Sequence, residues 1–382
     1  MFRSWRKGDG EPLRPTGGSR EFVEGGSLLA LDGVYRREKA GSRKEIGVVS
    51  SALACYEPEK LETSVMILLD GARAFIKSGH SSSAVRLFEV AKELCLRSAR
   101  PERLSEERQR QDGELDSEKR KFASFFRNTG PKTCAHRVII ISDSLGLPLL
   151  NDVIDHDSVE TTYAFHIREK LKSFGGAQVL PFCRRFTTGE HAVSTLENER
   201  SLIAGSAVLL HFGLNDAAER TFTDMQRLAI SVASPKVLEG MTRFAREQRV
   251  HIIRAFPGRS YLSPERFRDR LVEACKICVK AGAGHVSLAT IVHPGMSAVQ
   301  ATPSAPRNFT RFNTIVHDVA HRFAVSVLDV DRICWGAGLP RTLTRDGMHL
   351  SEHGHELVSE GFVEQLTRRS TPPRDREAVA SR

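Results

Sequence analysis

From about residue 135 onward, short apolar runs rich in Val and Ile alternate with longer amphipathic segments. This alternation limits the possible fold more than any other feature of the chain. The apolar runs predict strands at 137–142, 177–183, 206–212, 250–255, 284–291 and 325–330. The amphipathic segments predict helices near 159–174, 235–248, 263–282, 308–323 and 353–368. Such alternation indicates an α/β fold, a parallel sheet with helices on both sides and ligands bound beyond the carboxyl ends of the strands.

Three short motifs carry the residues that ester chemistry requires. Ser144, in the sequence Asp-Ser-Leu, directly follows the run of 138–141. Asn215, in Gly-Leu-Asn-Asp, follows the run of 208–210. The third motif, Asp-Gly-Met-His, lies near the C-terminus. Since Ser144 and Asn215 both stand at predicted strand ends, we expect them at one edge of the sheet.

The residue types fit nucleophilic catalysis. A serine hydroxyl attacks a carbonyl once a base removes its proton, and His349 is the candidate base for Ser144. Asp346, three residues before His349, is placed to orient the imidazole and stabilise its charged form. Asn215 offers an amide N–H to the oxyanion, at ~2.7–4 kcal/mol per donor. The plainer alternatives are a helix-capping Ser144, a surface His349 and turn residues at 215 and 346.

These motifs resemble the blocks of the SGNH or GDSL hydrolases over about residues 135–368, roughly 60% of the chain. The resemblance implies a three-layer α/β/α, flavodoxin-like fold with a parallel five-stranded sheet. It implies Ser144 as nucleophile, Asp346 and His349 as the acid–base pair, and an oxyanion hole made by Ser144, Gly189 and Asn215. Gly189 is assigned because it precedes the Asn strand, and its backbone N–H would be the donor.

The chain departs from the family pattern in two places. Ser142 stands where the first block usually opens with Gly. The arginines of 184–186 precede Gly189, which suggests a pocket that is more polar or prefers anions. Residues 143–148 and 215–220 bear a looser likeness to bacterial members that accompany glycan-building enzymes, which implies a carbohydrate or similar alcohol as the substrate. Among the remaining polar residues, Asp216 is expected to brace its loop, His211 to lie in the core, and His353 and His355 to be solvated.

The N-terminal third has a different texture. Residues 1–45 are rich in Gly, Arg and Ser and are expected to be flexible. Helical patterns fill 46–130, followed by a hydrolase domain at 131–370 and a flexible basic tail at 371–382. One tetratricopeptide-like helix pair is indicated by its packing residues, which are Leu68, Ala72, Phe75, Gly79, Ala84, Phe88 and Ala91. It is either a hairpin packed on its neighbour or a repeat that binds a protein partner. The charged stretch 99–121 predicts a solvated helix or a linker.

Composition narrows the class of protein. The net charge of +9 favours anions in general, but no basic motif interleaved with aromatic residues appears, so nucleic acid is not an expected partner. No apolar run reaches the roughly 18 residues that would span a membrane. The seven cysteines are odd in number and scattered. The Cys275–Cys278 pair has Cys-x-x-Cys spacing without a second pair, and so predicts buried thiols rather than a zinc site. These features together indicate a reducing cytoplasm.

The sequence therefore predicts a serine esterase that uses no metal and no cofactor. We expect it to cleave a small acyl ester, such as an O-acetyl group on a carbohydrate, through an acyl-enzyme. The alternatives are an acyltransferase with the same triad and a non-catalytic scaffold that docks through the N-terminal helices.

Overall fold

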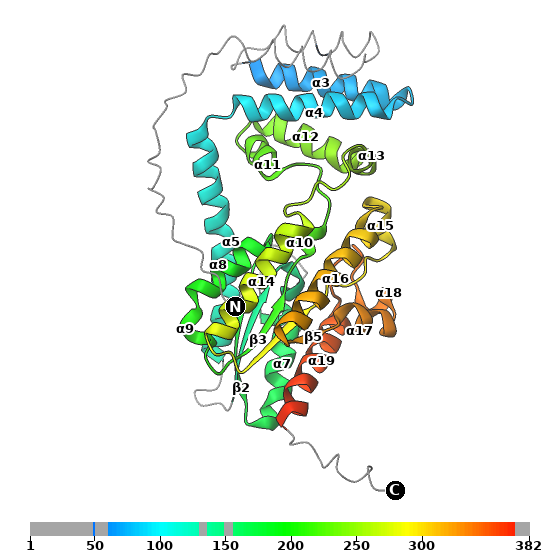
Figure 1. Ribbon diagram of the computed structural model, residues 1–382. Coiled ribbons are helices and arrows are strands. Elements are labelled where there is room, and N and C mark those ends of the chain that lie inside the picture. Colours follow the sequence, from blue (N-terminus) through cyan, green and yellow to red (C-terminus); the bar gives the residue numbers. More distant parts are fainter. Residues whose placement is uncertain (1–48, 50–59, 130–135, 149–155, 371–382) are drawn as a thin grey trace, which may run out of the picture.

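A computed structural model describes residues 49, 60–129, 136–148 and 156–370 (Figure 1). The predicted flexible segments 1–45 and 371–382 lie outside the described residues. No helix within the described ranges is long and apolar enough to cross a membrane.

Residues from 136 onward form a five-stranded parallel sheet with helices around it, and the strand order is β2-β1-β3-β4-β5. The strands are β1 (His136–Ser142), β2 (Ala177–Cys183), β3 (Ala207–His211), β4 (His285–Ala289) and β5 (Ser326–Leu328). The order reverses at β1, so the chain passes from β1 to β2 on one side and from β2 back over β1 to β3 on the other. Ser144 follows β1, at the point where ligands bind in sheets of this kind.

Helices cover both faces of the sheet because successive strand residues point to opposite sides. Ile139 and Ile141 of β1 join the core beneath α8 (Gly189–Asn198), α14 (Pro264–Lys280) and α16 (Ala305–Phe323). Val138 and Ile140 join the opposite core, which is covered by α5 (Pro101–Thr129), α7 (Tyr163–Leu171), α17 (Val330–Ala337) and α19 (Glu352–Ser370). The three-layer α/β/α fold expected from the sequence is confirmed.

Short helices connect these elements. They are η2 (Ser144–Gly146), α6 (His156–Glu160), η3 (Lys172–Phe174), α9 (Arg200–Ile203), α10 (Leu214–Ala217), α15 (Met296–Ala301) and α18 (Leu339–Thr342). Cys275 and Cys278 belong to α14, and their thiols are free and buried in the same core as Ile139 and Ile141, as the sequence predicted.

One predicted strand is wrong. Residues 250–255 form helix α13 (Arg249–Ala255), not a strand. Its apolar run is only a few residues long, and periodicity alone does not distinguish a buried strand from one turn of a buried helix. Ile252 packs among the helices described next rather than in the sheet.

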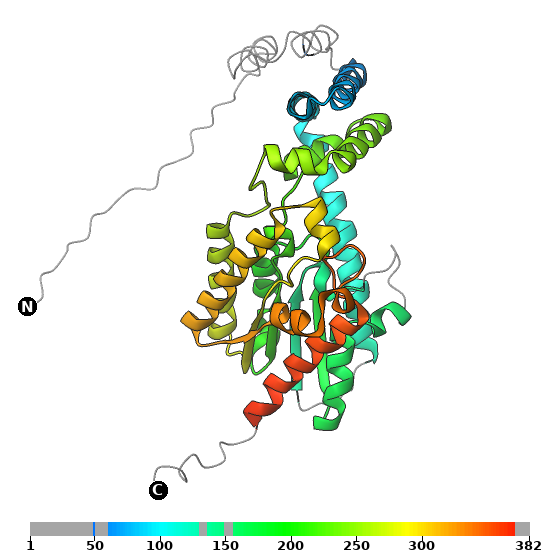
Figure 2. The ribbon, with the colours of Figure 1, turned by 90° about the vertical axis from the view of Figure 1, so that its right-hand side faces the viewer.

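A separate helical core lies beyond one end of the sheet (Figures 1 and 2). The hairpin of α3 (Leu61–Lys77) and α4 (Ser81–Ser98) packs on α11 (Asp224–Ser231), α12 (Pro235–Glu247) and α13, which come from the segment between β3 and β4. Its tetratricopeptide-like character and its binding of a protein partner stay predictions. The hairpin does pack on neighbouring helices of the same chain.

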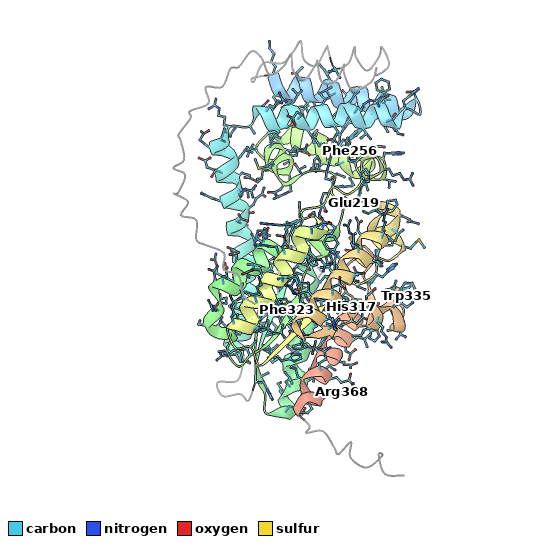
Figure 3. All side chains as sticks on the ribbon, in the orientation of Figure 1. Glu219, Phe256, His317, Phe323, Trp335 and Arg368 are labelled. Carbon is cyan, nitrogen blue, oxygen red and sulfur yellow. The ribbon has the colours of Figure 1, made fainter. Side chains whose placement is uncertain are left out.

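Buried charge ties the hairpin to the segment after β3. Lys92 of α4 is fully buried, donates to the carbonyl of Thr221 at 2.9 Å and pairs with Glu89. Its ammonium lies 5.1 Å from the ring centroid of Phe88 and 6.0 Å from that of Phe256, which Figure 3 labels in this junction. Burial lowers the pKa of Lys92 to about 8, against the opposing effect of Glu89. The contacts stabilise a cation that burial alone would penalise.

Residues 101–121 of the charged stretch belong to α5, a helix that runs from the hairpin to the sheet (Figure 2). Its last turns bury Phe122 and Phe126 in the core on one face of the sheet, where α5 packs along β2. Its middle turns carry acidic side chains that form ion pairs with the loop after β2, close to the candidate site described below.

Candidate active site

Ser144 begins a tight turn directly after β1. Asp143 caps this turn, because its Oδ1 accepts a hydrogen bond from the N–H of Leu145 at 2.9 Å. The Ser144 side chain leaves the sheet at its carboxyl edge, and its Oγ lies 2.9 Å from Nε2 of His349. The two residues are 205 positions apart in the chain. The structure thus brings the predicted hydroxyl and imidazole into hydrogen-bond contact.

His349 is oriented by Asp346. Its Nδ1 lies 2.6 Å from Asp346 Oδ2. The other carboxylate oxygen, Oδ1, accepts from the N–H groups of Met348 at 2.8 Å and His349 at 3.1 Å, and from Thr344 Oγ1 at 2.8 Å. Burial alone would raise the pKa of Asp346, but the hydrogen bonds from His349 and from the backbone hold it well below its usual range. The carboxylate is therefore ionised and fixed in place.

The turn between these residues depends on Gly347. Gly347 has φ +71°, and its carbonyl accepts a hydrogen bond from the N–H of Gly295 at 2.7 Å. A Cβ at this position would lie 2.6 Å from Ser297 Oγ. The segment after β4 therefore supports the Asp346–His349 loop from behind.

Asn215 is held by two neighbours at the start of the segment after β3. It is 5% exposed, and its Nδ2 donates to the carbonyl of Thr187 at 3.2 Å. Its Oδ1 accepts from Nη2 of Arg220 at 2.8 Å. A guanidinium donor can only face the oxygen of the amide, so Arg220 determines which end of the side chain is nitrogen. One N–H of Nδ2 remains for another acceptor. Sequence reasoning did not assign this positioning role to Arg220.

Asp143 has a structural role that sequence reasoning also missed. Its Oδ2 accepts from the backbone N–H groups of Gly213 at 3.2 Å and Leu214 at 3.0 Å. One buried carboxylate therefore joins the loop of Ser144 to the loop of Asn215. Burial raises its pKa to about 6, against the opposing effect of the backbone donors. The position of Asp143 beside Ser144 was visible in the sequence, but its contact with a loop 70 residues away was not.

Gly189 does not present a free N–H. It begins α8, and its N–H donates to Asp216 Oδ2 at 2.9 Å. The N–H predicted as an oxyanion donor is therefore already paired with a carboxylate of the same chain. Asp216 joins the start of α8 to α10, as the predicted bracing role requires. Burial raises the pKa of Asp216 to about 8, and the Gly189 hydrogen bond opposes that shift.

The arginines before Gly189 face α5. Arg184 is buried and pairs with Asp112 at 2.6 Å, and Arg185 pairs with Glu118 at 2.8 Å. Because carboxylates of the same chain already neutralise both side chains, the expectation that they attract an anionic ligand loses its basis. These carboxylates lie 72 and 67 residues from Arg184 and Arg185, so local sequence patterns do not reveal the two pairs.

Two histidines are buried beneath the Ser144 turn. The rings of His211 and His355 both pack near that of Tyr163, with centroids 5.7 and 5.4 Å from its centroid, and the N–H of Tyr163 donates to Nδ1 of His355 at 3.2 Å. His211 is a core residue, as predicted, whereas the expectation that His355 is solvated is wrong. Burial lowers the pKa of His211 to about 4 and that of His355 to about 3. Both rings are neutral packing residues at ordinary pH. In the described part of the chain, no group of three or more His, Cys, Asp or Glu residues could hold a metal ion.

Solved structures similar to this chain include three bacterial proteins. The lipase/acylhydrolase from Enterococcus faecalis is 16% identical, with 63% of this chain and 99% of that chain covered and a TM-score of 0.43. A lipolytic protein of the G-D-S-L family from Veillonella parvula is 13% identical, with 61% and 100% covered and a TM-score of 0.41. A variant of an acetyl-xylooligosaccharide esterase from Geobacillus is 13% identical, with 61% and 94% covered and a TM-score of 0.43. No curated protein matches the chain.

The GDSL-like lipase/acylhydrolase family matches residues 156–357, which is just over half of the chain. The matched span contains Asn215, Asp346 and His349, and it begins after β1 and Ser144. This protein therefore belongs to the GDSL-like lipase/acylhydrolase family and is a hydrolase of the SGNH type.

Proposed function

We propose that the protein is a serine esterase that removes a small acyl group, such as acetyl, from a polyhydroxylated alcohol. Ser144 is the nucleophile, His349 is the base and Asp346 orients it. The second N–H of Asn215 Nδ2 and the backbone N–H of Ser144 stabilise the oxyanion. Gly189 is left out of this set because its N–H already donates to a carboxylate.

The reaction proceeds in two halves. Ser144 Oγ attacks the carbonyl carbon while its proton passes to Nε2 of His349, and the carbonyl oxygen becomes the oxyanion. Collapse of this intermediate breaks the bond to the alcohol oxygen, which takes the proton from His349. Water then attacks the acyl-enzyme and gives its proton to His349. The second collapse releases the carboxylic acid and returns the proton to Ser144.

One observation supports the proposal above the others. The contacts of 2.9 Å from Ser144 Oγ to His349 Nε2 and 2.6 Å from His349 Nδ1 to Asp346 form an unbroken chain of hydrogen bonds. Because Asp346 is held ionised, it favours the tautomer of His349 with the proton on Nδ1. That tautomer leaves Nε2 free to accept the serine proton.

Hydrolysis of p-nitrophenyl acetate tests the proposal. We expect Ser144→Ala to lower kcat/KM by at least about a thousandfold, since the reaction then loses its nucleophile. Ser173→Ala, which removes an exposed hydroxyl from η3, is the matched control and should act like the wild type. Wild-type and Ser144→Ala rates within tenfold of each other would remove Ser144 from the reaction.

A further inference from the structure

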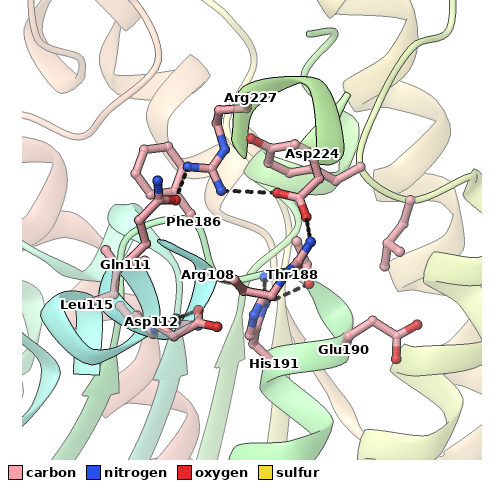
Figure 4. Close-up of a pocket in the computed structure, with 13 residues that line it drawn as sticks. Arg108, Gln111, Asp112, Leu115, Phe186, Thr188, Glu190, His191, Asp224 and Arg227 are labelled. Carbon is pink, nitrogen blue, oxygen red and sulfur yellow. Dashed lines mark hydrogen bonds and ion pairs between the residues drawn. The ribbon is translucent and has the colours of Figure 1, made fainter. Parts of the chain in front are cut away.

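We propose that a pocket bounded by α5, the loop after β2 and the start of α11 binds the alcohol part of the ester as a neutral, polyhydroxylated ring such as a sugar. This inference rests on the proposed function and adds where and how the alcohol binds. The pocket has a volume of about 320 Å³, at the lower end of the range for small-molecule sites (Figure 4). α5 lies before residues 156–357, which the family matches, so a helix outside that match would contribute to the choice of substrate.

The loop after β2 connects the pocket to the candidate oxyanion donor, Asn215. Phe186 and Thr188 line it, and the carbonyl of Thr187 between them accepts the hydrogen bond from Asn215 Nδ2 at 3.2 Å. The N–H of Arg184, another lining residue, donates to the carbonyl of Ser142 at 3.2 Å. The loop that forms the pocket is therefore bonded to the strand end before Ser144 and to Asn215. Ser144, Asn215 and His349 do not line the pocket themselves, so this bonded loop is the structural link between a ring bound there and the reacting ester.

The charges that line the pocket balance. Three arginines face three carboxylates, and the residues are Arg108, Arg184, Arg227, Asp112, Glu190 and Asp224. Asp224 pairs with Arg108 at 2.7 Å and with Arg227 at 3.0 Å (Figure 4). Glu190 pairs with Arg266 at 2.7 Å, outside the lining. An anionic ligand would have to displace these internal partners, so the charge balance favours a neutral one.

Polar atoms in the lining suit hydroxyl groups, which both donate and accept. The Nη1 of Arg227 donates to Gln111 Oε1 at 2.5 Å. The Nε of the same guanidinium is buried and has no hydrogen-bond partner among the described residues. Burial and the neighbouring Arg184 lower the pKa of His191, which keeps another lining side chain neutral.

Phe186 supplies an aromatic surface. It is 45% exposed and has φ +57°, a left-handed conformation that is uncommon for a bulky residue. Such a conformation persists where the surroundings impose it, and it occurs often in ligand-binding loops. Tyr261 also lines the pocket, and the Arg220 guanidinium that holds Asn215 lies 4.6 Å from its ring centroid. Aromatic faces pack against the apolar C–H faces of sugar rings, while the polar lining meets the hydroxyl groups.

Saturation-transfer NMR on the full chain tests binding without turnover. The probes are methyl glucoside and, as its anionic counterpart, methyl glucuronide. We expect methyl glucoside to bind more tightly. We expect Phe186→Ala to raise its Kd by about tenfold, the equivalent of one aromatic contact. Alanine is chosen because it retains the Cβ and removes only the ring. Phe174→Ala removes a ring that is 50% exposed, near the opposite end of the strands, and should leave the Kd unchanged.

A kinetic arm links the pocket to the reaction. In Phe186→Ala, kcat/KM for a monoacetate of methyl glucoside, whose other hydroxyl groups are free, divided by that for p-nitrophenyl acetate should fall by about tenfold. Tighter binding of the glucuronide, or an unchanged Kd and an unchanged ratio in Phe186→Ala, would overturn the inference. Those results leave the role of Ser144 intact. Conversely, Ser144→Ala with full activity would refute the proposed function while NMR still reports on the pocket.

Discussion

Replacing Asp346 with asparagine tests how the site sets the tautomer of His349. Three hydrogen-bond donors converge on Asp346 Oδ1, so the oxygen of an asparagine is expected to take that place and preserve the loop. The amide nitrogen would then stand in the place of Oδ2, 2.6 Å from Nδ1 of His349. Two N–H groups cannot face each other there, so the ring proton moves to Nε2. The Nε2–H then donates to Ser144 Oγ and can no longer accept its proton.

We expect this change to lower kcat by about 10³–10⁴-fold, which corresponds to about 4–5.5 kcal/mol of transition-state stabilisation. The loss is large because the base is blocked rather than weakened. Stability should change little, since the three hydrogen bonds to the oxygen remain. Asp346→Ala breaks all of them and should lower both kcat and the melting temperature.

The assay is p-nitrophenyl acetate hydrolysis at saturating substrate, with melting temperatures measured on the same preparations. Ser144→Ala sets the background rate. An Asp346→Asn enzyme that retains kcat within tenfold of the wild type would refute the tautomer argument. A drop in melting temperature equal to that of Asp346→Ala would instead show that the loop depends on the charge.

Three further predictions follow from single contacts. Arg220→Lys should lower kcat about tenfold with little change in KM, because it removes the planar donor that orients the side-chain amide of Asn215. A change in KM alone would contradict this role. Gly354→Ala should lower the melting temperature by several degrees, because its Cβ would overlap the carbonyl oxygen of Thr342, whereas Gly336→Ala has open space and should not. The difference in free energy of unfolding between the wild type and His355→Gln, measured by urea unfolding, should shrink by about 1 kcal/mol for each pH unit that the pH falls below 6.5. The wild type loses stability in this range because His355 gains a proton in the unfolded chain but, when buried, does not gain one until pH about 3. A difference in free energy that stays constant with pH would contradict this prediction.

The sequence predicted the sheet well because its strands are buried on both faces. Runs such as 138–141 are apolar throughout, and a Val/Ile-rich run that precedes a helix is typical of a strand in a parallel sheet. The same rule failed at 250–255, where a similar run packs in a helical core. Burial was read correctly in both cases, but the conformation depends on neighbours that lie far away in the chain.

The candidate site was predictable where its chemistry lies within one motif. Asp346 and His349 are three residues apart, so their contact follows from local spacing. The pairing of Arg184 was not predictable because its partner, Asp112, lies in a stretch whose composition predicts a solvated helix or a linker. The Gly189 assignment rested on order along the chain, and the hydrogen bond that occupies its N–H comes from another loop.

Covalent labelling of the native enzyme with a fluorophosphonate, followed by peptide mass spectrometry, examines the nucleophile itself. A single adduct on Ser144 is the predicted outcome, with labelling slowed at least a hundredfold in His349→Ala because the base no longer removes the proton. An adduct on a different residue, or equal labelling rates in the two proteins, would contradict the assignment of these two side chains as nucleophile and base.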